Sequence, residues 1–398
     1  MTTGRNNPSN ADGHAVLAQR VFDGYGWHAD AAVLIRDERI AGVSFWGKVP
    51  SDWPQMRLPD GAFLAPGFID LQVNGGGGVL LNDQPTVDGM RTIARSHRRF
   101  GTTACLPTLI TDTREQVRAA VAAARSIAGR NGILGLHLEG PFINPKRPGV
   151  HRPDRIVQPS AGDLEELCEL AGAGRSLVTL APECLPTGFV RTLASSGVRV
   201  SIGHSEATAA DVMQAVADGA TGVTHLFNAM PPLSARAPGI IGAALAERRL
   251  TAGLIVDGIH VDPVSVRAAF AAKGCDRVAL VTDAMPTVGT SLDRFELMGR
   301  TIRLADGRLT TETGTLAGAH LDMATAVRNA VKLAQLSLED ALRAASLTPA
   351  HFLGLENERG ALVPGARADL VALTDDLTVI ATWLAGKNDD PRMSSVVQ

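Results

Sequence analysis

The sequence contains few cysteines, and none belongs to a CxxC motif. The four cysteines are far apart in the chain: Cys105, Cys168, Cys184 and Cys275. A chain of 398 residues with 45% hydrophobic content can bury a large core, so it does not depend on disulfides. We therefore expect reduced, mostly buried thiols in a cytoplasmic protein.

The sequence also lacks an excess of charge of either sign. It has 38 basic and 41 acidic residues, for a formal net charge of -3. This balance argues against a broad basic face, and we expect no nucleic-acid partner. A local anion-binding site is still compatible with this balance, and we expect any phosphate compound that the protein binds to be small.

Long apolar runs are absent. The first 14 residues, MTTGRNNPSNADGH, have no apolar segment of a signal peptide, and no stretch reaches the length of a membrane span. We expect residues 1–14 to form a disordered tail, with no membrane association. The glycine run 75–78 lacks the lysine of a P-loop, which favours a flexible loop over a nucleotide cradle.

The two ends of the chain share a β-type pattern. Residues 15–65 alternate short apolar runs with Gly, Asp and Pro turns, and residues 361–386 return to this pattern. We expect residues 15–65 and 355–387 to form one small β-sandwich domain flanking a domain of residues 66–354.

The central domain alternates apolar runs with amphipathic segments, which is typical of parallel βα units. Eight expected strands follow in order: Phe68 to Asn74, Thr103 to Leu109, Ile133 to Glu139, Leu177 to Glu183, Arg199 to His204, Gly222 to Phe227, Ala252 to Asp257 and Arg277 to Asp283. Helices are expected at Val87 to Phe100, Arg114 to Ala128, Ala161 to Ala171, Ala207 to Ala217, Pro263 to Lys273, Asp322 to Leu336 and Leu338 to Ala345. Eight strands favour an α/β fold, a closed (β/α)8 TIM barrel, with a β-like insertion at residues 294–313.

Polar residues end most of the expected strands. They are, in chain order, Gln72, Asn74, His137, Glu139, Glu183, His204, His225, Asp257 with His260 beyond it, and Asp283. In this fold the active site lies at the C-terminal ends of the strands, and such residues are costly to bury unless they are paired or bind a metal. The pattern predicts a site at one mouth of the barrel.

Three of these residues make a metal-ligand set. Glu139, His204 and His225 combine one carboxylate with two imidazoles, which suits one Zn²⁺ ion, or Fe, Mn or Co, with an open position for water. A metal there would lower the pKa of a bound water, and Asp283 could accept its proton. The alternative is that the histidines bond to core carbonyls, the glutamate pairs with an arginine, and Asp283 caps a segment.

A second group of residues is suited to phosphate. Asn228 and Ala229 directly follow the strand of His225, Arg236 lies on a Pro-rich loop, and His260 follows the seventh strand. Arginine presents a fork of donors to phosphate oxygens, and loop amides add more. The cluster alone is weak evidence, because a loop arginine is usually a solvated charge.

The motifs together resemble a known family. They are PGFIDLQVNGGGG (66–78), HLEGPFINPKRPGVH (137–151), GHSEAT (203–208), THLFNAMPPLSARAPGIIGAAL (224–245), DGIHVDP (257–263) and LVTDAM (280–285). In this order they are similar to the N-acetylglucosamine-6-phosphate deacetylases of the amidohydrolase superfamily, through nearly the whole chain. HLEGP and THLFNAMP are specific to these enzymes within the superfamily.

The resemblance implies a barrel with a small β-sandwich and hydrolysis of N-acetylglucosamine 6-phosphate, in amino-sugar catabolism and cell-wall sugar recycling. It implies that Glu139, His204 and His225 bind one divalent ion per subunit and that Asp283 is the acid/base. His151 would contact the substrate near its acetamido group, and four further residues would hold the sugar phosphate: Asn228, Ala229, Arg236 and His260. It also implies a homodimer in which Arg236 reaches the neighbouring active site.

Two positions depart from related patterns. Many amidohydrolases have His-x-His on the first strand, whereas this chain has Gln72 and Asn74, poor zinc ligands that would mark a vestigial second-metal position. Leu316 to Ala319 lacks an expected serine, which could alter a contact to the acetyl group. Two other functions remain open: a deacetylase for another sugar phosphate, such as N-acetylgalactosamine 6-phosphate, or another N-acyl amine, and an inactive barrel that serves as a sugar-phosphate sensor.

Overall fold

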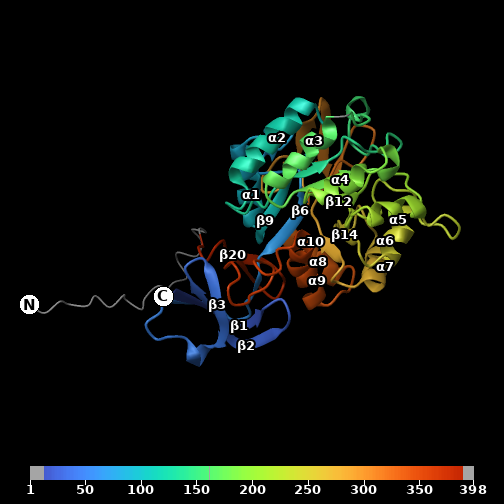
Figure 1. The fold of residues 1–398 in the computed structure, drawn as a ribbon. Helices are drawn as coiled ribbons and strands as arrows, with labels where there is room; N and C mark the ends of the chain where they lie inside the picture. Colours follow the sequence, from blue (N-terminus) through green and yellow to red (C-terminus); the bar gives the residue numbers. More distant parts are fainter. Residues whose placement is uncertain (1–12, 161, 389–398) are drawn as a thin grey trace, which may run out of the picture.

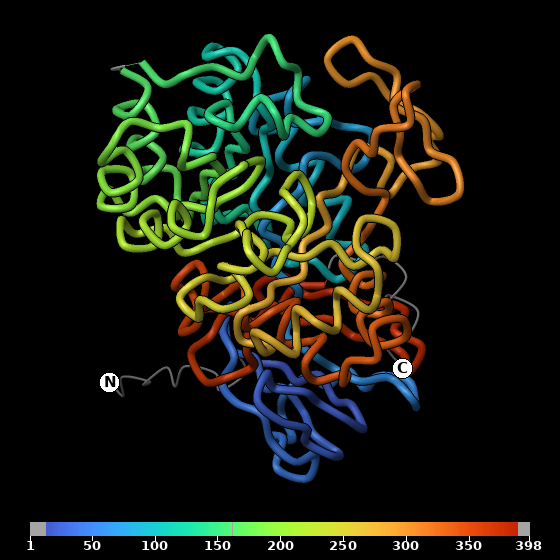
Figure 2. The backbone as a smooth tube through the Cα atoms, turned by 90° about the vertical axis from the view of Figure 1, so that its right-hand side faces the viewer, coloured from blue at the N-terminus to red at the C-terminus, as the bar shows by residue number. Residues whose placement is uncertain are grey.

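The structure is a computed structural model that describes residues 13–160 and 162–388. The blue N-terminal strands form one end of the molecule, and the barrel with its helices forms the rest (Figure 1). In the turned view, red C-terminal segments lie between these strands and the barrel (Figure 2). The two ends of the chain therefore meet on one side of the barrel.

Strands from both ends of the chain lie in one sheet, in the order β20-β19-β5-β1-β2-β3, with β4 paired to β1. Their bounds are β1 (Gly13–Phe22), β2 (Trp27–Arg36), β3 (Arg39–Phe45), β4 (Gln55–Arg57), β5 (Phe63–Pro66), β19 (Leu370–Leu373) and β20 (Val379–Trp383). The antiparallel pairing of β19 with β5 joins the ends. β1 begins at Gly13, two residues inside the expected tail. Residues 1–12 lie outside the described residues, and the domain boundaries stay a prediction.

Eight parallel strands confirm the predicted barrel. They are β6 (Phe68–Val73), β9 (Thr102–Ile110), β10 (His137–Glu139), β11 (Leu177–Leu180), β12 (Arg199–Ile202), β13 (Gly222–Val223), β14 (Thr251–Leu254) and β15 (Val278–Leu280). A parallel bridge between Val73 and Ala284 connects the first strand to the chain beyond the last and closes the ring. Most strands are shorter than expected, because the chain turns away from the ladder before its polar residues.

The helices largely follow the predicted segments. The described α-helices are α1 (Val87–Arg98), α2 (Arg114–Ile127), α3 (Asp163–Cys168), α4 (Phe189–Ser195), α5 (Ala209–Ala217), α6 (Gly239–Ala246), α7 (Pro263–Lys273), α8 (Met323–Lys332), α9 (Leu338–Ala345) and α10 (Leu347–Leu353). The expected start of the third helix, Ala161, lies outside the described residues. Sequence patterns missed α4, α6 and α10: α4 and α10 are short, and α6 (GIIGAALA) has no polar face to give a helical period. No helix in the described part of the chain is both long and apolar enough to cross a bilayer.

The expected insertion forms a three-stranded sheet, β16 (Arg294–Leu297), β17 (Arg300–Ala305) and β18 (Arg308–Thr310). Its apolar side chains cluster with Ile110, the last residue of β9, and with Val150 and Met285 on the loops that follow β10 and β15. The glycine run forms β7 (Gly75–Gly76), which pairs with β8 (Val79–Leu80). A Cβ at Gly75 would lie 2.5 Å from the carbonyl oxygen of Val79, so this hairpin needs glycine there. Both features flank the mouth of the barrel.

Candidate active site

The strand ends converge on a cavity of about 220 Å³ at the mouth of the barrel. Nine of the predicted site residues line it: Asn74, Glu139, His151, His204, His225, Asn228, Ala229, His260 and Asp283. Gln72 does not line the cavity, but its amide bonds to two residues that do. Arg236 is exposed and does not line the cavity of its own chain.

Glu139, His204 and His225 present their donor atoms to one point. Oε1 of Glu139 lies 3.0 Å from Nε2 of His204 and 2.9 Å from Nε2 of His225, and the two Nε2 atoms are 3.1 Å apart. Donor atoms bound to a tetrahedral zinc ion at about 2.0–2.1 Å lie about 3.3–3.4 Å from one another. A small outward adjustment would therefore place all three around a divalent ion.

The backbone around His204 fixes which of its nitrogens faces this point. Nδ1 donates a hydrogen bond to the carbonyl oxygen of Arg147 at 2.8 Å, so Nε2 keeps a lone pair for a metal. Gly149, on the same loop, lies so close that a Cβ there would be 3.2 Å from the ring of His204. The loop after β10 thus holds a ligand carried by β12.

Three site residues adopt left-handed backbone conformations at the strand exits. The φ angles are +49° at His204, +31° at His225 and +51° at Asp283. Such φ values cost on the order of 1 kcal/mol or more for residues other than glycine, and they cluster at functional sites. The turn away from the ladder directs each side chain into the mouth. It also explains why the strands end early.

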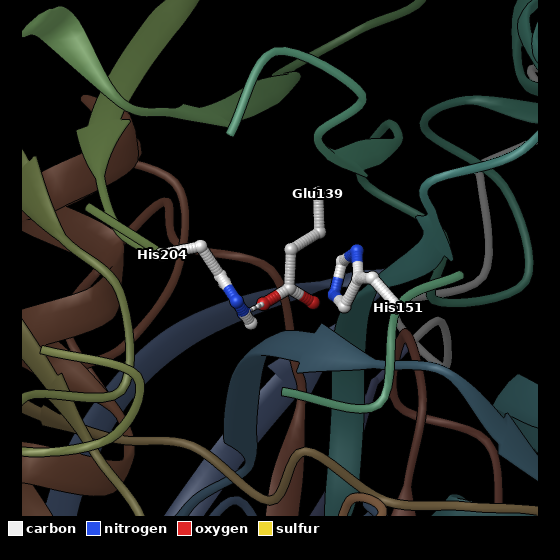
Figure 3. A group of neighbouring side chains, drawn as sticks. All are labelled: Glu139, His151 and His204. Carbon is white, nitrogen blue, oxygen red and sulfur yellow. Dashed lines mark hydrogen bonds and ion pairs between the residues drawn. The ribbon is translucent and has the colours of Figure 1, made fainter. Parts of the chain in front are cut away.

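His151 is a further candidate ligand. The ligand atoms of Glu139, His151 and His204 all lie within 4.8 Å of one another, and Figure 3 shows these side chains pointing toward each other. The Thr111 hydroxyl donates to the carbonyl oxygen of Glu139 at 3.3 Å, so it accepts from Nδ1 of His151 at 2.7 Å. The remaining ring nitrogen of His151 is then free to accept a proton or bind a ligand. Thr111 was not singled out in the sequence, because a threonine at a strand end has no motif.

Burial and charge set the pKa values of these groups. Burial raises the pKa of Glu139, but the hydrogen bonds from His204 and His225 outweigh it and hold that pKa well below its usual range. Burial lowers the pKa of His225, whereas the hydrogen bond and charge of Glu139 raise it, with a net increase. Burial, followed by the charge of His204, lowers the pKa of His151 to about 3. His151 is therefore a neutral imidazole near neutral pH.

Asp283 is held by the two amides on β6 and just beyond it. Its Oδ1 accepts hydrogen bonds from Nε2 of Gln72 at 3.0 Å and from Nδ2 of Asn74 at 2.6 Å, which leaves Oδ2 for another partner. Nε2 of Gln72 also donates to Oε2 of Glu139 at 3.1 Å. Burial and the charge of Glu139 raise the pKa of Asp283 to about 6, so the carboxylate can exchange a proton near neutral pH.

A buried carboxylate that the sequence did not reveal supports Asp283. Asp70, on β6, accepts hydrogen bonds from the Thr282 hydroxyl at 2.5 Å and from the backbone N–H groups of Thr282 and Gln72 at 3.3 and 3.2 Å. The N–H of Asp283 donates to the carbonyl oxygen of Gln72 at 3.0 Å. This network holds the turn that carries Asp283 against the first strand. Burial raises the pKa of Asp70 to about 7.

Three of the predicted phosphate residues, Asn228, Ala229 and His260, line the same cavity as His151. Asp257 accepts hydrogen bonds from Nδ1 and the backbone N–H of His260 at 2.6 and 2.8 Å, so it orients that ring. Asn228 donates from Nδ2 to the carbonyl oxygen of His225 at 3.3 Å, which ties the loop to the ligand before it. Asn228, Ala229 and His260 are therefore brought together with the metal-ligand candidates.

Two polar strand-end residues have structural roles instead. His137 is fully buried and bonds to Thr179 at 2.7 Å and Thr108 at 3.3 Å, both inside the barrel. Glu183 is exposed, and it accepts hydrogen bonds from the Ser205 hydroxyl and the Asn144 amide at 2.7 and 2.9 Å. It links three loops outside the cavity.

The remaining wall of the cavity is largely apolar. It contains Ile110, Ile255, Met285 and Leu316, none of which has a sequence signature of a binding residue except by its position at a strand end. Leu316 occupies the place where the sequence suggested a missing hydroxyl. The cavity thus combines a polar floor with an apolar side.

The arrangement suits hydrolysis of an amide or ester that carries an anionic group. It offers a metal-ligand set, a carboxylate with a raised pKa beside it and a further imidazole, that of His260, held by Asp257. The interpretation in which Glu139 pairs with an arginine is wrong, because within the described residues its carboxylate contacts Gln72 and the two histidines.

Comparison with known proteins identifies relatives over almost the whole chain. A model of the amidohydrolase family matches residues 63–388. N-acetylgalactosamine-6-phosphate deacetylase of Shewanella sp. (strain ANA-3) is 39% identical over 384 residues, which cover 95% of each chain. N-acetylglucosamine-6-phosphate deacetylase of Haemophilus influenzae is 35% identical and covers 94% of this chain and 98% of the relative. The crystal structure of the Pasteurella multocida N-acetylglucosamine-6-phosphate deacetylase superposes with a TM-score of 0.91 at 34% identity, covering 95% of this chain and 99% of that one.

Proposed function

The chain belongs to the amidohydrolase family, and from that premise we propose that it is a metal-dependent hydrolase that converts N-acetyl-D-glucosamine 6-phosphate to D-glucosamine 6-phosphate and acetate. The observation that carries the proposal is the convergence of Glu139, His204 and His225 beside Asp283 in one cavity. Relatives with this named activity match the chain from end to end.

The residues present fit one divalent ion. Glu139, His204 and His225 would hold it, and zinc suits these ligands best, although iron, manganese and cobalt are also compatible. When bound, such an ion polarises a carbonyl and lowers the pKa of water. The position of a second ion is occupied by the amides of Gln72 and Asn74, whose NH₂ groups already bond to Asp283 and Glu139.

Asp283 is proposed as the proton carrier. Its Oδ1 is occupied by the two amides, so Oδ2 accepts the proton of the attacking water. The same carboxyl then protonates the departing amine, without which the tetrahedral intermediate would expel water again. In the metal-free protein the pKa of Asp283 is raised to about 6, and a cation bound beside the carboxylate would lower that pKa and favour the form that accepts a proton from water.

His151 and the phosphate residues are proposed to position the substrate. His151, neutral and buried beside His204, would donate a hydrogen bond to the acetamido group of the substrate or accept one from it. Asn228, the backbone of Ala229, and His260 would hold the sugar phosphate. Their place in the same cavity supports this orientation.

Arg236 is proposed to complete the phosphate site of a neighbouring subunit. It lies on an exposed loop, residues 231–238, which leads into α6 and extends away from the barrel (Figure 1). Leu233, on the same loop, is 53% exposed, so this protruding loop presents an apolar side chain next to the arginine. We therefore propose a homodimer. The free cysteines are consistent with the expected cytoplasmic location.

Complementation between two inactive variants tests the shared site. Arg236→Ala subunits lack the arginine that they donate, and Asp283→Asn subunits lack their own proton carrier. In a mixed dimer the Arg236→Ala subunit keeps Asp283 and receives Arg236 from its partner, so activity should return to about a quarter of the wild-type value in a random mixture. Mixtures with no more activity than the two separate variants would contradict the shared site.

The C4 epimer is a second candidate substrate, because one of the relatives is named for N-acetylgalactosamine 6-phosphate. An acetate-release assay on the metal-loaded enzyme tests both epimers, each with and without the 6-phosphate. We expect the highest kcat/KM for N-acetylglucosamine 6-phosphate and a large loss without the phosphate. No acetate release from either phosphate would contradict the proposed function and favour the sensor.

A further inference from the structure

A cavity of about 590 Å³ lies at the end of the barrel opposite the candidate active site. Its walls include Leu134 and Arg175, which directly precede β10 and β11, and the C-terminal end of α2. The other wall is Glu38 and Arg39, at the turn between β2 and β3 of the terminal sheet. The cavity therefore lies between the barrel and that sheet.

Five arginines line this cavity: Arg39, Arg125, Arg175, Arg359 and Arg367. Only two carboxylates, Glu38 and Glu358, line it with them. No histidine is among the described residues that form its wall, so it offers no group that exchanges protons near neutral pH. Its chemistry suits the binding of an anion and not catalysis.

Three of the arginines are held by carboxylates. Buried Asp369 pairs with Arg359 and, at 3.3 Å, with Arg367, which also reaches Glu38 at 3.3 Å. Arg125 bonds in the same way to Glu169 at 3.1 Å. These pairs fix the shape of the cavity and leave fewer of their donors for a ligand.

Arg39 and Arg175 have no such partner. Within residues 13–160 and 162–388, no carboxylate oxygen is recorded within 4.0 Å of either guanidinium group. Nη1 of Arg39 donates to the carbonyl oxygen of Gly365, which leaves its other donors available. Each guanidinium presents five N–H donors in a planar fork that matches phosphate oxygens.

Arginines outnumber carboxylates along the wall of this cavity by five to two. Burial and then the charge of Arg175 lower the pKa of neighbouring Arg199, while the charge of Glu356 opposes them. Burial also lowers the pKa of Arg359; the charge of Asp369 opposes this effect, and the charge of Arg367 adds to it. Like charges gathered around one cavity repel each other, and an anion between them removes that repulsion.

We propose that this cavity binds a small phosphate-bearing anion, free phosphate or a phosphate monoester, through Arg39 and Arg175. Arg39 belongs to the terminal sheet and Arg175 to the barrel, so the bound anion joins the two. The volume lies within the range of pockets for small molecules and exceeds what one phosphate fills, which leaves room for an organic group. Binding there stabilises the folded chain without changing the catalytic cavity.

The test compares thermal unfolding of metal-loaded variants with inorganic phosphate as the probe. Wild type, Arg175→Gln and Arg39→Gln are titrated at constant ionic strength, with Arg91→Gln as control, because Arg91 is exposed on α1, does not line this cavity and forms an ion pair with Asp88 of the same helix. No sugar phosphate is added, because a phosphate monoester would compete with the probe for this cavity; a parallel titration of the same proteins in a His260→Ala background shows how much of the rise comes from the candidate active site.

At a phosphate concentration 100-fold above Kd, the Tm of wild type and Arg91→Gln should rise by about 3 °C. The rise should fall below 1 °C in Arg175→Gln and Arg39→Gln, with kcat and KM unchanged. An absent rise in wild type, or an equal rise in Arg175→Gln and Arg39→Gln, would overturn the proposal. Because the Tm comparison requires no turnover, its outcome is independent of the proposed reaction.

Discussion

Replacing Asp283 with asparagine should abolish turnover while leaving the site assembled. The side-chain oxygen of the asparagine can take the place of Oδ1 and accept the same two hydrogen bonds from Gln72 and Asn74. The opposite orientation would place its NH₂ group against two other NH₂ groups, so the amide has one favoured orientation. The NH₂ group then occupies the position of Oδ2, where it cannot accept a proton.

The magnitude follows from the number of proton transfers. One positioned acid or base contributes about 10²–10⁴-fold to a rate, and Asp283 is proposed to act in two successive steps. We expect kcat to fall by about 10³–10⁴-fold, or about 4–5 kcal/mol of transition-state stabilisation. The metal-free fold should not suffer, because the substitution removes a buried carboxylate whose pKa without metal is raised to about 6, and that charge is unfavourable at pH 8.

The assay is acetate release under metal-replete conditions, with bound metal and Tm measured on the same preparations. The expected result is full metal content, turnover reduced by at least three orders of magnitude and, after metal removal, a Tm at pH 8 equal to or above that of metal-free wild type. Turnover within tenfold of wild type, with metal content unchanged, would refute the role of Asp283.

Two other predictions concern metal and proton binding. Because Glu139 raises the pKa of His225 in the metal-free protein, protons compete with the metal ion for this imidazole, and the amount of zinc retained after dialysis should increase from pH 6 to pH 8. His225→Ala should lose zinc at both pH values, whereas the surface control His351→Ala should retain it as wild type does. Equal zinc retention by wild type at the two pH values would contradict this competition. The pKa of Asp70 is higher in the folded protein (about 7) than in the unfolded chain (3.8), so its contribution to stability decreases as pH rises between these values. In urea unfolding, the free energy of unfolding of wild type should therefore fall, relative to that of Asp70→Asn, by on the order of 2 kcal/mol between pH 5 and pH 8. If the difference in unfolding free energy between the two proteins does not change with pH, Asp70 is not a buried group that titrates in this range.

Local chemistry allowed the barrel and most of its mouth to be predicted from the sequence. Apolar runs that end in Glu139, His204 or Asp283 indicate both a strand and the point where it ends, because a buried polar side chain needs a hydrogen-bond partner or a metal ion close to it. The same logic was wrong to expect Glu183 at the mouth, since a short turn after β11 carries it outward to bond with Ser205.

What the sequence could not reveal depends on contacts between distant segments. Asp70 lies in an apolar strand pattern, and only the proximity of Thr282, 212 positions away, explains its burial. Thr111 likewise acquires its importance from His151, 40 residues further on. The anion cavity is a third case, because Arg39 and Arg175 lie in unrelated motifs and meet only through the packing of the terminal sheet on the barrel.

The left-handed conformations at His204, His225 and Asp283 have a consequence for engineering this protein. At these φ values glycine is the least strained residue, so His204→Gly or Asp283→Gly relieves the backbone at a position where function requires a side chain. That relief comes with the loss of a buried side chain and its hydrogen bonds, so these positions offer no net gain in stability. Libraries built on this scaffold should hold the three positions constant and seek stability elsewhere, such as in the surface loops.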